Sequence, residues 1–406
     1  MRTGLLLGTI LGCLALPASA AAQSPLFRRV SATLAGIEGE LVEVRRDLHR
    51  HPEVSGQERR TAGVVAERLR KLGLEVRTGV GGHGVVGVLR GDRPGPTVAY
   101  RADMDAVYSN APDPVEFRSE TPGVRHICGH DLHTTVGLAL AAGLASVRAE
   151  LPGTVVFLFQ PAEENVTGAK AMLADGVFSP LPAAVFGLHT APLPVGQLGT
   201  MPGTMMAWRD RVSVRITGSG DLGAAADTVS ALIRSLSTVD PSQAVVPRQP
   251  PFVVAQVAPI GETADSRTVN GSISVADDAS SARANGTITA LVGRLALPEI
   301  SFALEYTPRW VPGVTNDAGL TSATTASIRR ALGADAVVDV NSISPAFSED
   351  YGAFQAETPG VFYYLGVGAI GMPHSPGYVA DEAAIVFGAR AMAAAVLDRM
   401  AGSPGA

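Results

Sequence analysis

Short apolar runs recur along the chain, each bounded by glycine, proline or charged residues. Six of them have the length and composition of strands, at 75–78, 85–89, 97–101, 155–159, 183–188 and 361–367. Apolar positions at helical spacing run from 41 to 72 and again from 136 to 147. Because strands alternate with helices, we expect an α/β fold with a central mixed sheet covered by helices.

The region at 209–311 has a pattern of its own. Its strand-like and helical runs follow one another in the order βαββαβ, at 211–216, 224–237, 252–257, 271–275, 282–295 and 300–306. This order is that of the ferredoxin-like split βαβ sandwich. We therefore predict an inserted domain at 209–311 and a discontinuous larger domain formed by 23–208 and 312–406.

One glycine-rich segment, Gly79-Val80-Gly81-Gly82-His83-Gly84, matches the G-x-G-x-x-G spacing of dinucleotide-binding loops. A loop of that kind must lead into a helix, whereas here a second strand pattern follows the glycines. The segment is therefore predicted to form the turn of a β-hairpin, and we expect no dinucleotide cofactor.

Residues 1–22 have the organisation of a secretory signal peptide. Arg2 precedes an apolar stretch from Gly4 to Leu16, and the small residues Ala18-Ser19-Ala20 follow. The stretch is too short to span a bilayer as a helix, so no integral membrane segment is expected after cleavage. These features predict an exported protein, periplasmic or secreted. Ile10-Leu11-Gly12-Cys13 leaves open a lipid anchor at Cys13, which the short apolar stretch before it disfavours.

Composition narrows the choice of partners and of covalent chemistry. The 406 residues carry a formal net charge of −6, so the basic footprint of a nucleic-acid-binding protein is missing. Of the two cysteines, Cys13 would leave with the signal peptide, which excludes an internal disulfide in the mature chain. The other, Cys128, is either a small buried hydrophobic residue or a bound thiolate, because a free thiol is a liability in an oxidising compartment.

Acidic residues and histidines follow the buried strand patterns. They are Asp103 and Asp105 after the run at 97–101, Glu163 and Glu164 after 155–159, His189 after 183–188, and His374 after 361–367. In open α/β sheets, ligands bind beyond the carboxyl ends of the strands. We therefore expect these side chains at one rim of the sheet.

Cys128 and His130 precede the helical pattern at 136–147 and can join the same rim. In an extended segment, side chains two residues apart point the same way, so both are expected to bind at one site. A donor set of thiolate, imidazole and carboxylate suits zinc, manganese, cobalt or nickel, and it does not suit calcium or magnesium.

Glu163 and Glu164 are adjacent carboxylates, and such a pair raises each other's pKa unless a cation relieves the repulsion. We expect Glu164 to bind metal and Glu163 to take a proton from a metal-activated water. Each feature alone has an ordinary explanation, because acidic pairs are usually solvated and single histidines are usually structural. Their joint occurrence after several strands favours the metal interpretation.

At these residues the chain resembles the M20 metallopeptidases, in particular the amidohydrolase branch of hippurate hydrolases and auxin-conjugate hydrolases. The matching segments cover nearly all of the mature chain outside the inserted region. They are Leu48-His49-Arg50-His51-Pro52-Glu53, Arg101-Ala102-Asp103-Met104-Asp105-Ala106, His126-Ile127-Cys128-Gly129-His130-Asp131-Leu132-His133-Thr134, Phe159-Gln160-Pro161-Ala162-Glu163-Glu164, Gly187-Leu188-His189, Ser348-Glu349-Asp350-Tyr351 and His374-Ser375-Pro376.

The resemblance implies a di-metal catalytic domain, interrupted by a lid domain that often mediates homodimers. It implies two divalent ions per chain (manganese, zinc, cobalt or nickel) bound by Cys128, His130, Glu164, His189 and His374, with Glu163 as the catalytic base. The neighbouring residues Asp103, Asp105, His126, Asp131 and His133 are expected to support this site rather than to bind metal.

The lid departs from the family pattern. The family's lid typically carries a G-x-G-x-H-G/A segment whose histidine helps to stabilise the oxyanion. Here Gly218-Ser219-Gly220-Asp221-Leu222-Gly223-Ala224 aligns best, with Leu222 in the histidine's place, and the sequence has no histidine between His189 and His374. The family's N-V-I-P stretch, which helps to hold the substrate carboxylate, is also missing. Either the metals alone suffice, or a donor such as Arg267 or Asn270 takes over.

The expected activity is metal-dependent hydrolysis of an amide bond in a small-molecule substrate, an N-acyl or N-aryl amino acid or a dipeptide-like compound. Two alternatives remain from the sequence. One is an amidase for substrates without an α-carboxylate, and the other is a metal-binding protein without enzymatic activity whose lid has degenerated.

Overall fold

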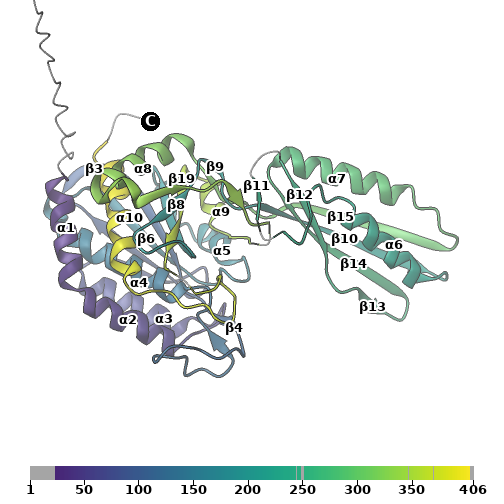
Figure 1. Ribbon diagram of the computed structural model, residues 1–406, viewed down its shortest axis with the longest axis horizontal. Helices are drawn as coiled ribbons and strands as arrows, with labels where there is room; N and C mark the ends of the chain where they lie inside the picture. Colours follow the sequence, from purple (N-terminus) through teal and green to yellow (C-terminus); the bar gives the residue numbers. More distant parts are fainter. Residues whose placement is uncertain (1–22, 244, 248–250, 346, 369, 403–406) are drawn as a thin grey trace, which may run out of the picture.

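The computed structural model describes residues 23–402 except 244, 248–250, 346 and 369, and Figure 1 shows a larger body with a smaller one extending from its side. The predicted signal peptide at 1–22, with Cys13, lies outside the described residues. Within the described residues, none of the helices combines the length and the apolar character that crossing a bilayer requires.

An eight-stranded mixed sheet forms the centre of the larger body. Its spatial order is β1 (Glu75–Val80), β2 (Gly84–Arg90), β6 (Pro152–Gln160), β3 (Arg93–Asp103), β7 (Val185–Ala191), β19 (Gly360–Gly366), β8 (Leu198–Thr200) and β17 (Val337–Asp339). The four central strands β6, β3, β7 and β19 are parallel. β1 and β2 run antiparallel to their neighbours, and β8 is antiparallel to β19 but parallel to β17. The six predicted strands and the mixed sheet are confirmed.

Helices cover both faces of this sheet because neighbouring side chains of each central strand point to opposite sides. Tyr100 packs into the larger core cluster, whereas the adjacent Ala99 belongs to a second cluster on the other face. The first face is covered by α1 (Pro25–Gly36), α2 (Glu38–Arg50), α3 (Arg59–Lys71), α4 (His130–Ala145), α8 (Ala318–Leu332) and α10 (Ala384–Met400). The second carries the short helices α5 (Gly168–Ala174) and α9 (Gly352–Gln355).

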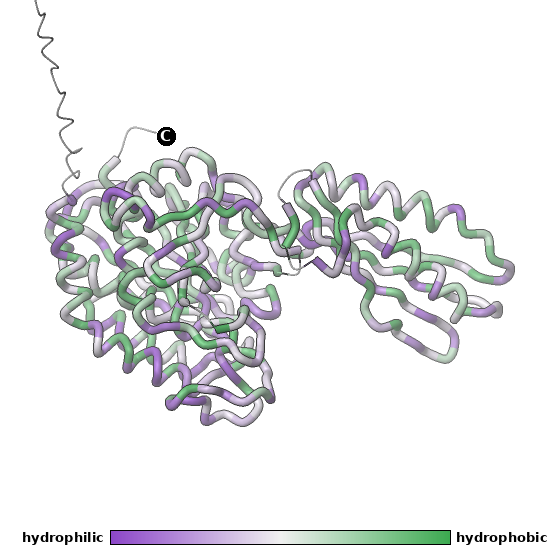
Figure 2. Tube along the Cα trace, viewed as in Figure 1, coloured by the Kyte–Doolittle hydropathy of each residue, from purple (hydrophilic) through white to green (hydrophobic). Residues whose placement is uncertain are grey.

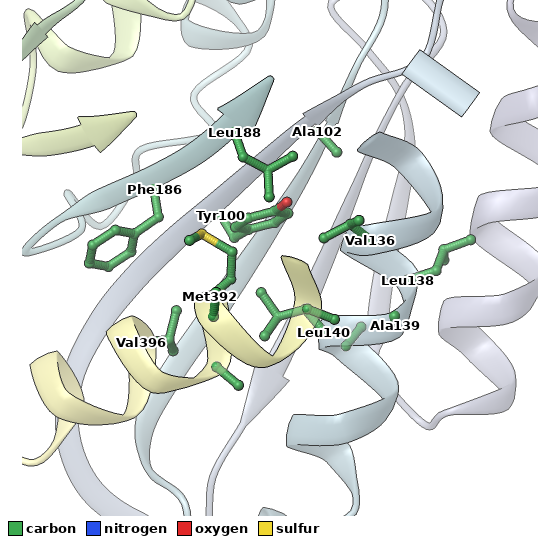
Figure 3. Close-up of a cluster of buried hydrophobic side chains, with 14 of the residues drawn as sticks. Tyr100, Ala102, Val136, Leu138, Ala139, Leu140, Phe186, Leu188, Met392 and Val396 are labelled. Atoms are coloured by element: carbon green, nitrogen blue, oxygen red, sulfur yellow. The ribbon is translucent and has the colours of Figure 1, made fainter. Parts of the chain in front are cut away.

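The larger core explains why the parallel strands are apolar on both sides. Figure 3 shows Tyr100 and Leu188 of the sheet beside Val136 and Leu140 of α4 and Met392 of α10. All five are at most 1% exposed. The hydropathy colouring of Figure 2 shows the same pattern along the chain, with apolar segments inside the larger body.

The helical pattern at 41–72 is formed by two helices with a break between them. Helix α2 ends at Arg50 and α3 begins at Arg59. Pro52 has no backbone N–H to donate within a helix, and Val54 forms a bridge to Ala106 instead. The apolar residues keep helical spacing on both sides of this break because each of the two helices buries an apolar face in the same core.

The glycine-rich segment forms the predicted hairpin turn. Strands β1 and β2 pair antiparallel across it, and Gly79, Gly81 and Gly82 all have positive φ. A Cβ on Gly81 would lie 2.7 Å from the backbone nitrogen of Met172, so this position has no room for a side chain.

The smaller body has the βαββαβ order expected for a split βαβ sandwich. Its elements are β10 (Trp208–Gly218), α6 (Leu222–Arg234), β12 (Val253–Val257), β14 (Ser266–Val275), α7 (Asp278–Gly293) and β15 (Ile300–Val311), with the short β13 (Gly261–Thr263) beside β14. All strands pair antiparallel in the order β12-β14-β10-β15. The domain borders at 209 and 311 stay predictions.

The two bodies share packed residues where they meet. Met206, Phe252 and Val254 belong to the second core cluster together with Ile343 of the larger body. Two pairs of short strands also form there: β11 (Val246–Pro247) pairs with β18 (Ser342–Ile343), and β9 (Gly203–Thr204) pairs with β16 (Thr315–Asn316). A further short pair, β4 (Val107–Tyr108) with β5 (Val124–Arg125), lies elsewhere. The inner end of the smaller sheet is therefore anchored to the larger body.

Candidate metal centre

The parallel strands bring the predicted site residues to one edge of the sheet, as expected. Asp103 ends β3, His189 lies near the end of β7, and Glu163 and Glu164 follow β6 within four residues. His374 follows β19 through a longer loop, and its backbone N–H donates to the carbonyl of Ile127 at 2.8 Å. That hydrogen bond ties the His374 loop to the segment that carries Cys128.

A first group of possible ligands consists of Cys128, His130 and His189, whose donor atoms lie within 4.8 Å of one another. The Cys128 Sγ is 3.1 Å from Nε2 of His189. Nδ1 of His189 lies 2.8 Å from the backbone oxygen of Thr190, and Nδ1 of His130 lies 3.2 Å from Asp105 Oδ1. Because each Nδ1 lies against an oxygen, the Nε2 atom of each ring faces the group.

Cys128 and His130 converge by a different route from the extended segment expected from the sequence. His130 is the first residue of α4, and Gly129 before it has a φ of +90°. A Cβ on Gly129 would lie 2.6 Å from the Tyr378 hydroxyl and 2.8 Å from Oγ1 of Thr190. The left-handed conformation of Gly129 at the start of the helix therefore turns the side chains of Cys128 and His130 to the same side. The alternation of side chains along a strand plays no part in this arrangement.

A second group consists of Cys128, Glu164 and His374. Nε2 of His374 is 3.1 Å from Oε1 of Glu164, and the His374 side chain is 45% exposed. His374 has a φ of +65°, a conformation that few residues other than glycine adopt and that is enriched at functional sites. The five sequence-predicted ligands thus form two triplets that share Cys128.

Two buried atoms test whether this donor set fits a metal. Among the described residues, Nε2 of His130 has no hydrogen-bond partner, and Oε1 of Glu164 has none beyond its 3.1 Å ion-pair contact with Nε2 of His374. Buried polar atoms are normally paired, and these two point at the ligand group. Thiolate, imidazole and carboxylate donors are those that zinc, manganese, cobalt or nickel accept.

The electrostatics of the group also fit a bound cation. Burial raises the pKa of the Cys128 thiol well above its ordinary value, and Glu164 and Glu163 add to the shift. Burial lowers the pKa of His189 well below its ordinary value, while the pKa of His130 is about 10 because Asp103 and Asp105 outweigh its burial. A divalent ion would relieve the repulsion among the acidic groups and favour the thiolate.

Glu163 lies beside the ligands and is 5% exposed. Its Oε2 is 3.9 Å from Nε2 of His130, and it lines the same cavity as Cys128. Burial raises the pKa of Glu163 well above its ordinary value, and the nearby Glu349 and Glu164 raise it further while Arg101 lowers it. A carboxyl group with an elevated pKa next to possible metal ligands is the arrangement expected of a general base.

The structure places Asp103 and Asp105 behind the ligands. Asp105 contacts His130, and its Oδ2 accepts hydrogen bonds from the Glu164 backbone N–H at 3.0 Å and from Ser55 at 2.6 Å. Asp103 lies 2.6 Å from Nδ1 of His133, whose Nε2 accepts the N–H of Thr190 at 2.9 Å. Both ring nitrogens of His133 therefore have partners, although His133, Asp103 and His130 also lie close enough together to hold a metal ion.

Asp131 and His126 belong to neither triplet. Oδ2 of Asp131 accepts hydrogen bonds from Arg45 Nε at 3.0 Å and from His49 Nδ1 at 2.8 Å. Burial lowers the pKa of His126 to about 4, and its ring centroid is 6.3 Å from that of His49. The contacts of Asp131 therefore tie the first turn of α4 to α2.

Comparison with known proteins decides the family. The model of peptidase family M20/M25/M40 matches residues 99–398. This chain belongs to the M20 family. The M20 assignment makes it a hydrolase acting on C–N bonds and removes the alternative of a purely metal-binding protein.

Relatives of this M20 chain cover most of its length. Thermostable carboxypeptidase 2 of Saccharolobus solfataricus is 33% identical over 384 residues, 88% of this chain and 94% of the relative. IAA-amino acid hydrolase ILR1-like 4 of Arabidopsis thaliana is 31% identical over 369 residues, 86% of this chain and 83% of the relative. The crystal structure of Bacillus subtilis YXEP, a dinuclear metal binding peptidase from the M20 family, matches with a TM-score of 0.75 at 28% identity, over 90% of this chain and 99% of that one.

A buried arginine network in this M20 chain had no assigned role from the sequence. Arg101 is fully buried and donates to Asp103 Oδ2 at 2.7 Å, to Glu349 Oε1 at 2.8 Å and to Gln160 Oε1 at 2.7 Å. Gln160 also donates to Asp350 at 2.6 Å. The network joins β3, β6 and the loop before α9 beneath Glu163. The sequence did hold a signal for this network, because Arg101 is a charged residue inside an otherwise apolar strand. A charged residue is seldom buried unless it is paired.

The lid residues considered from the sequence lie far from the ligands of their own chain. β10 leaves the larger body at Trp208 and ends at Gly218, roughly 30 Å away at the usual rise per residue, and Leu222 starts α6 at that outer end. Arg267 pairs with Ile216 near the same end, and its guanidinium donates to the backbone oxygen of Thr263. Asn270 pairs with Ser213 halfway along the sheet. Arg267 and Asn270 therefore cannot supply the missing donor within one chain.

A cavity of about 410 Å³ opens beside the ligand triplets. Cys128, Glu163, Glu164, His189 and His374 line one part of it. Much of the rest is apolar, with Leu193, Met206, Val245, Val340, Phe347 and Met372. Among the described residues that line it, none is lysine or arginine. The cavity has the size and mostly apolar character of a small-molecule site.

Proposed function

We propose that this M20 chain hydrolyses the amide bond of small N-acyl or N-aryl amino acids or of dipeptide-like substrates. Two divalent ions would be held by the triplets Cys128, His130, His189 and Cys128, Glu164, His374. The observation that carries the proposal is the convergence of these donors with Glu163 at the end of a cavity large enough for such a substrate.

The bound ions would supply Lewis acidity, which acidifies a water molecule and polarises the scissile carbonyl. Glu163 accepts the proton that the attacking water loses, and it returns that proton to the leaving nitrogen as the C–N bond breaks. Asp105 holds Glu164 and His130 in place through the hydrogen bonds described above. Arg101 holds Glu349 and Asp350 beneath Glu163, which keeps the base in a fixed environment.

The test is reconstitution of the metal-free protein with manganese, zinc, cobalt or nickel, followed by assays on a panel of N-acyl amino acids. We expect about two ions per chain by elemental analysis, amine release from part of the panel, and loss of that activity on chelation. Metal content of no more than about 0.2 ion per chain after reconstitution with each metal would refute the proposed centre.

A second candidate is an amidase for substrates without an α-carboxylate. Two observations favour it. None of the described residues that line the cavity is lysine or arginine, and the sequence lacks the N-V-I-P stretch that helps to hold the substrate carboxylate in the family it resembles. A free carboxylate would then contribute little to binding, and its amide would be an equally good substrate.

A further inference from the structure

The histidines of the two triplets differ in how their rings are held. In the first triplet, the Nδ1 atoms of His130 and His189 lie 3.2 and 2.8 Å from an oxygen atom, and such a second contact fixes the orientation of a ligand ring. In the second triplet, Nε2 of His374 faces Glu164, but Nδ1 of His374 has no hydrogen-bond partner among the described residues. The position of the His374 ring therefore depends on the loop that carries it.

The His374 loop, residues 370–378, is joined by two hydrogen bonds to the segment that leads into α4. The backbone N–H of His374 donates to the backbone oxygen of Ile127 at 2.8 Å. Nη1 of Arg125 donates to the backbone oxygen of Pro376 at 3.3 Å. Because the same segment presents the cysteine that both triplets share, these bonds hold the loop next to that ligand.

Arg125 joins the loop to a further part of the chain. Its side chain is buried, and Nη1 also donates to the backbone oxygens of Pro112 at 2.8 Å and Ala111 at 3.3 Å. Nη2 donates to Oδ1 of Asp113 at 3.1 Å. A planar guanidinium presents its N–H groups in fixed directions, so one arginine can hold several segments at defined distances from one another.

Asp113 lies in a strap, residues 109–123, that is attached to α2. Oδ2 of Asp113 lies 3.0 Å from Nε2 of His49, and the ring centre of Phe117 lies 5.0 Å from the guanidinium carbon of Arg45. Helix α2 is packed into the larger core cluster. The strap therefore gives the guanidinium a fixed anionic partner, which is supported by the core of the larger body.

We propose that Arg125 and Asp113 are positioning residues for the second metal ion. They hold the His374 loop where His374 completes the triplet with Cys128 and Glu164. The apparent affinity for an ion falls in proportion to the fraction of molecules whose ligands are in place, so a loop that moves away weakens binding at this triplet. The inference rests on the proposed two-metal centre. The first triplet takes no ligand from the loop, so its ion should bind without this support.

The primary experiment compares the metal content of residues 23–406 with that of the same chain carrying Arg125→Met. Both proteins are stripped of metal and titrated with zinc, and bound zinc is measured by elemental analysis. The wild type should bind about two ions, and the variant should bind the second ion ~10–100-fold more weakly, the usual effect of losing a group that orients a ligand. Cys128 should stay protected from a thiol reagent in the variant, because the first ion still occupies its sulfur.

A double-mutant cycle with His374→Ala shows whether Arg125 acts through the loop. His374→Ala removes the ligand itself and should also leave about one ion per chain. In that background, Arg125→Met should weaken zinc binding no further, because the two changes remove the same interaction. A general loss of structure would instead lower the zinc content again, and that result would overturn the positioning role.

Arg148→Met is the matched control. Nη2 of Arg148 also donates to backbone oxygens, those of Gly73 at 3.0 Å and Leu72 at 3.4 Å, but these contacts lie at the end of α3. Both ions should remain bound in this variant. Where Arg125→Met does not fold, Arg125→Lys takes its place. The ammonium keeps the charge but lacks the planar group that reaches both Asp113 and the loop, so the second ion should still bind about tenfold more weakly.

The outcomes separate the inference from the centre on which it rests. Two ions bound as tightly in the Arg125 variant as in the wild type would overturn the inference and leave the two-metal centre intact. Loss of both ions, with Cys128 reactive after reconstitution, would show that Arg125 supports the whole centre and would overturn its assignment to the second triplet. A wild-type chain that binds no zinc would instead remove the proposed centre.

Discussion

The Glu58 carboxylate accepts a hydrogen bond from the backbone N–H of Ala162 at 2.8 Å. Glu58 is fully buried between α2 and α3, and Ala162 directly precedes Glu163, the proposed base. Ala162 has a φ of +54°, an unfavourable conformation for a residue with a side chain. Glu58 thus holds a strained turn in the loop that presents Glu163, and no local pattern in the sequence indicated this role.

Glu58→Ala should lower kcat by about 10- to 100-fold with little change in KM or metal content. The reason is that a small displacement of a catalytic group is costly even when the mutated residue touches no substrate. Glu58→Gln should restore most of the activity, because its amide oxygen can still accept the Ala162 N–H. Steady-state kinetics and elemental analysis of both variants check this.

Glu53→Ala is the matched control for that experiment. Glu53 accepts the backbone N–H groups of Arg60 and Thr61 at the start of α3, at 2.9 and 2.8 Å, and makes no such bond to the Glu163 loop. Its loss should cost about 1 kcal/mol of stability, as for a helix cap, while kcat stays near that of the wild type. Equal losses of kcat in Glu53→Ala and Glu58→Ala would show that the effect is only structural.

Glu163→Gln should abolish turnover while metal content stays near that of the wild type. The amide preserves the shape of the side chain but cannot accept a proton, and removal of a general base costs ~10²–10⁴ in rate. Glu164→Gln should instead lower metal occupancy, because it removes one oxygen donor of the second triplet. Metal analysis of the two variants tests this division of roles, which would be wrong if their occupancies matched.

Cys128 should react with a thiol reagent much faster in the metal-free protein than in the loaded protein. Coordination would occupy the sulfur, and Sγ belongs to both triplets. The measurement is the modification rate of the Cys128 thiol before and after reconstitution. Identical rates in the two forms would argue against a bound thiolate.

An N-acyl amino acid and its own carboxamide should be hydrolysed with kcat/KM values within about tenfold of each other. A hydrogen bond to a charged group contributes ~1.5–3 kcal/mol, and none of the described residues that line the cavity is a lysine or arginine to supply one. The comparison needs identical metal loading. A preference above about a hundredfold for the free acid would reveal a carboxylate clamp.

The sequence alone was enough to predict the strands of the sheet, the βαββαβ order of the inserted region and the residues that surround the centre. Apolar runs report burial directly, and acidic residues or histidines just after such runs must lie at the carboxyl edge of a parallel sheet. The helical spacing at 41–72 did not show where the helices end, because two helices share one apolar spacing and Pro52 lies between them.

Only the tertiary structure decided how the predicted ligands divide between the two triplets. Nothing in the spacing of Cys128, Glu164 and His374 indicates that the cysteine lies in both triplets, because these residues come from three separate segments, before α4, after β6 and after β19. The orientation of the His130 ring likewise depends on Asp105, which is 25 residues away in the sequence. Long-range contacts of this kind depend on how the elements pack, and local patterns carry no information about packing.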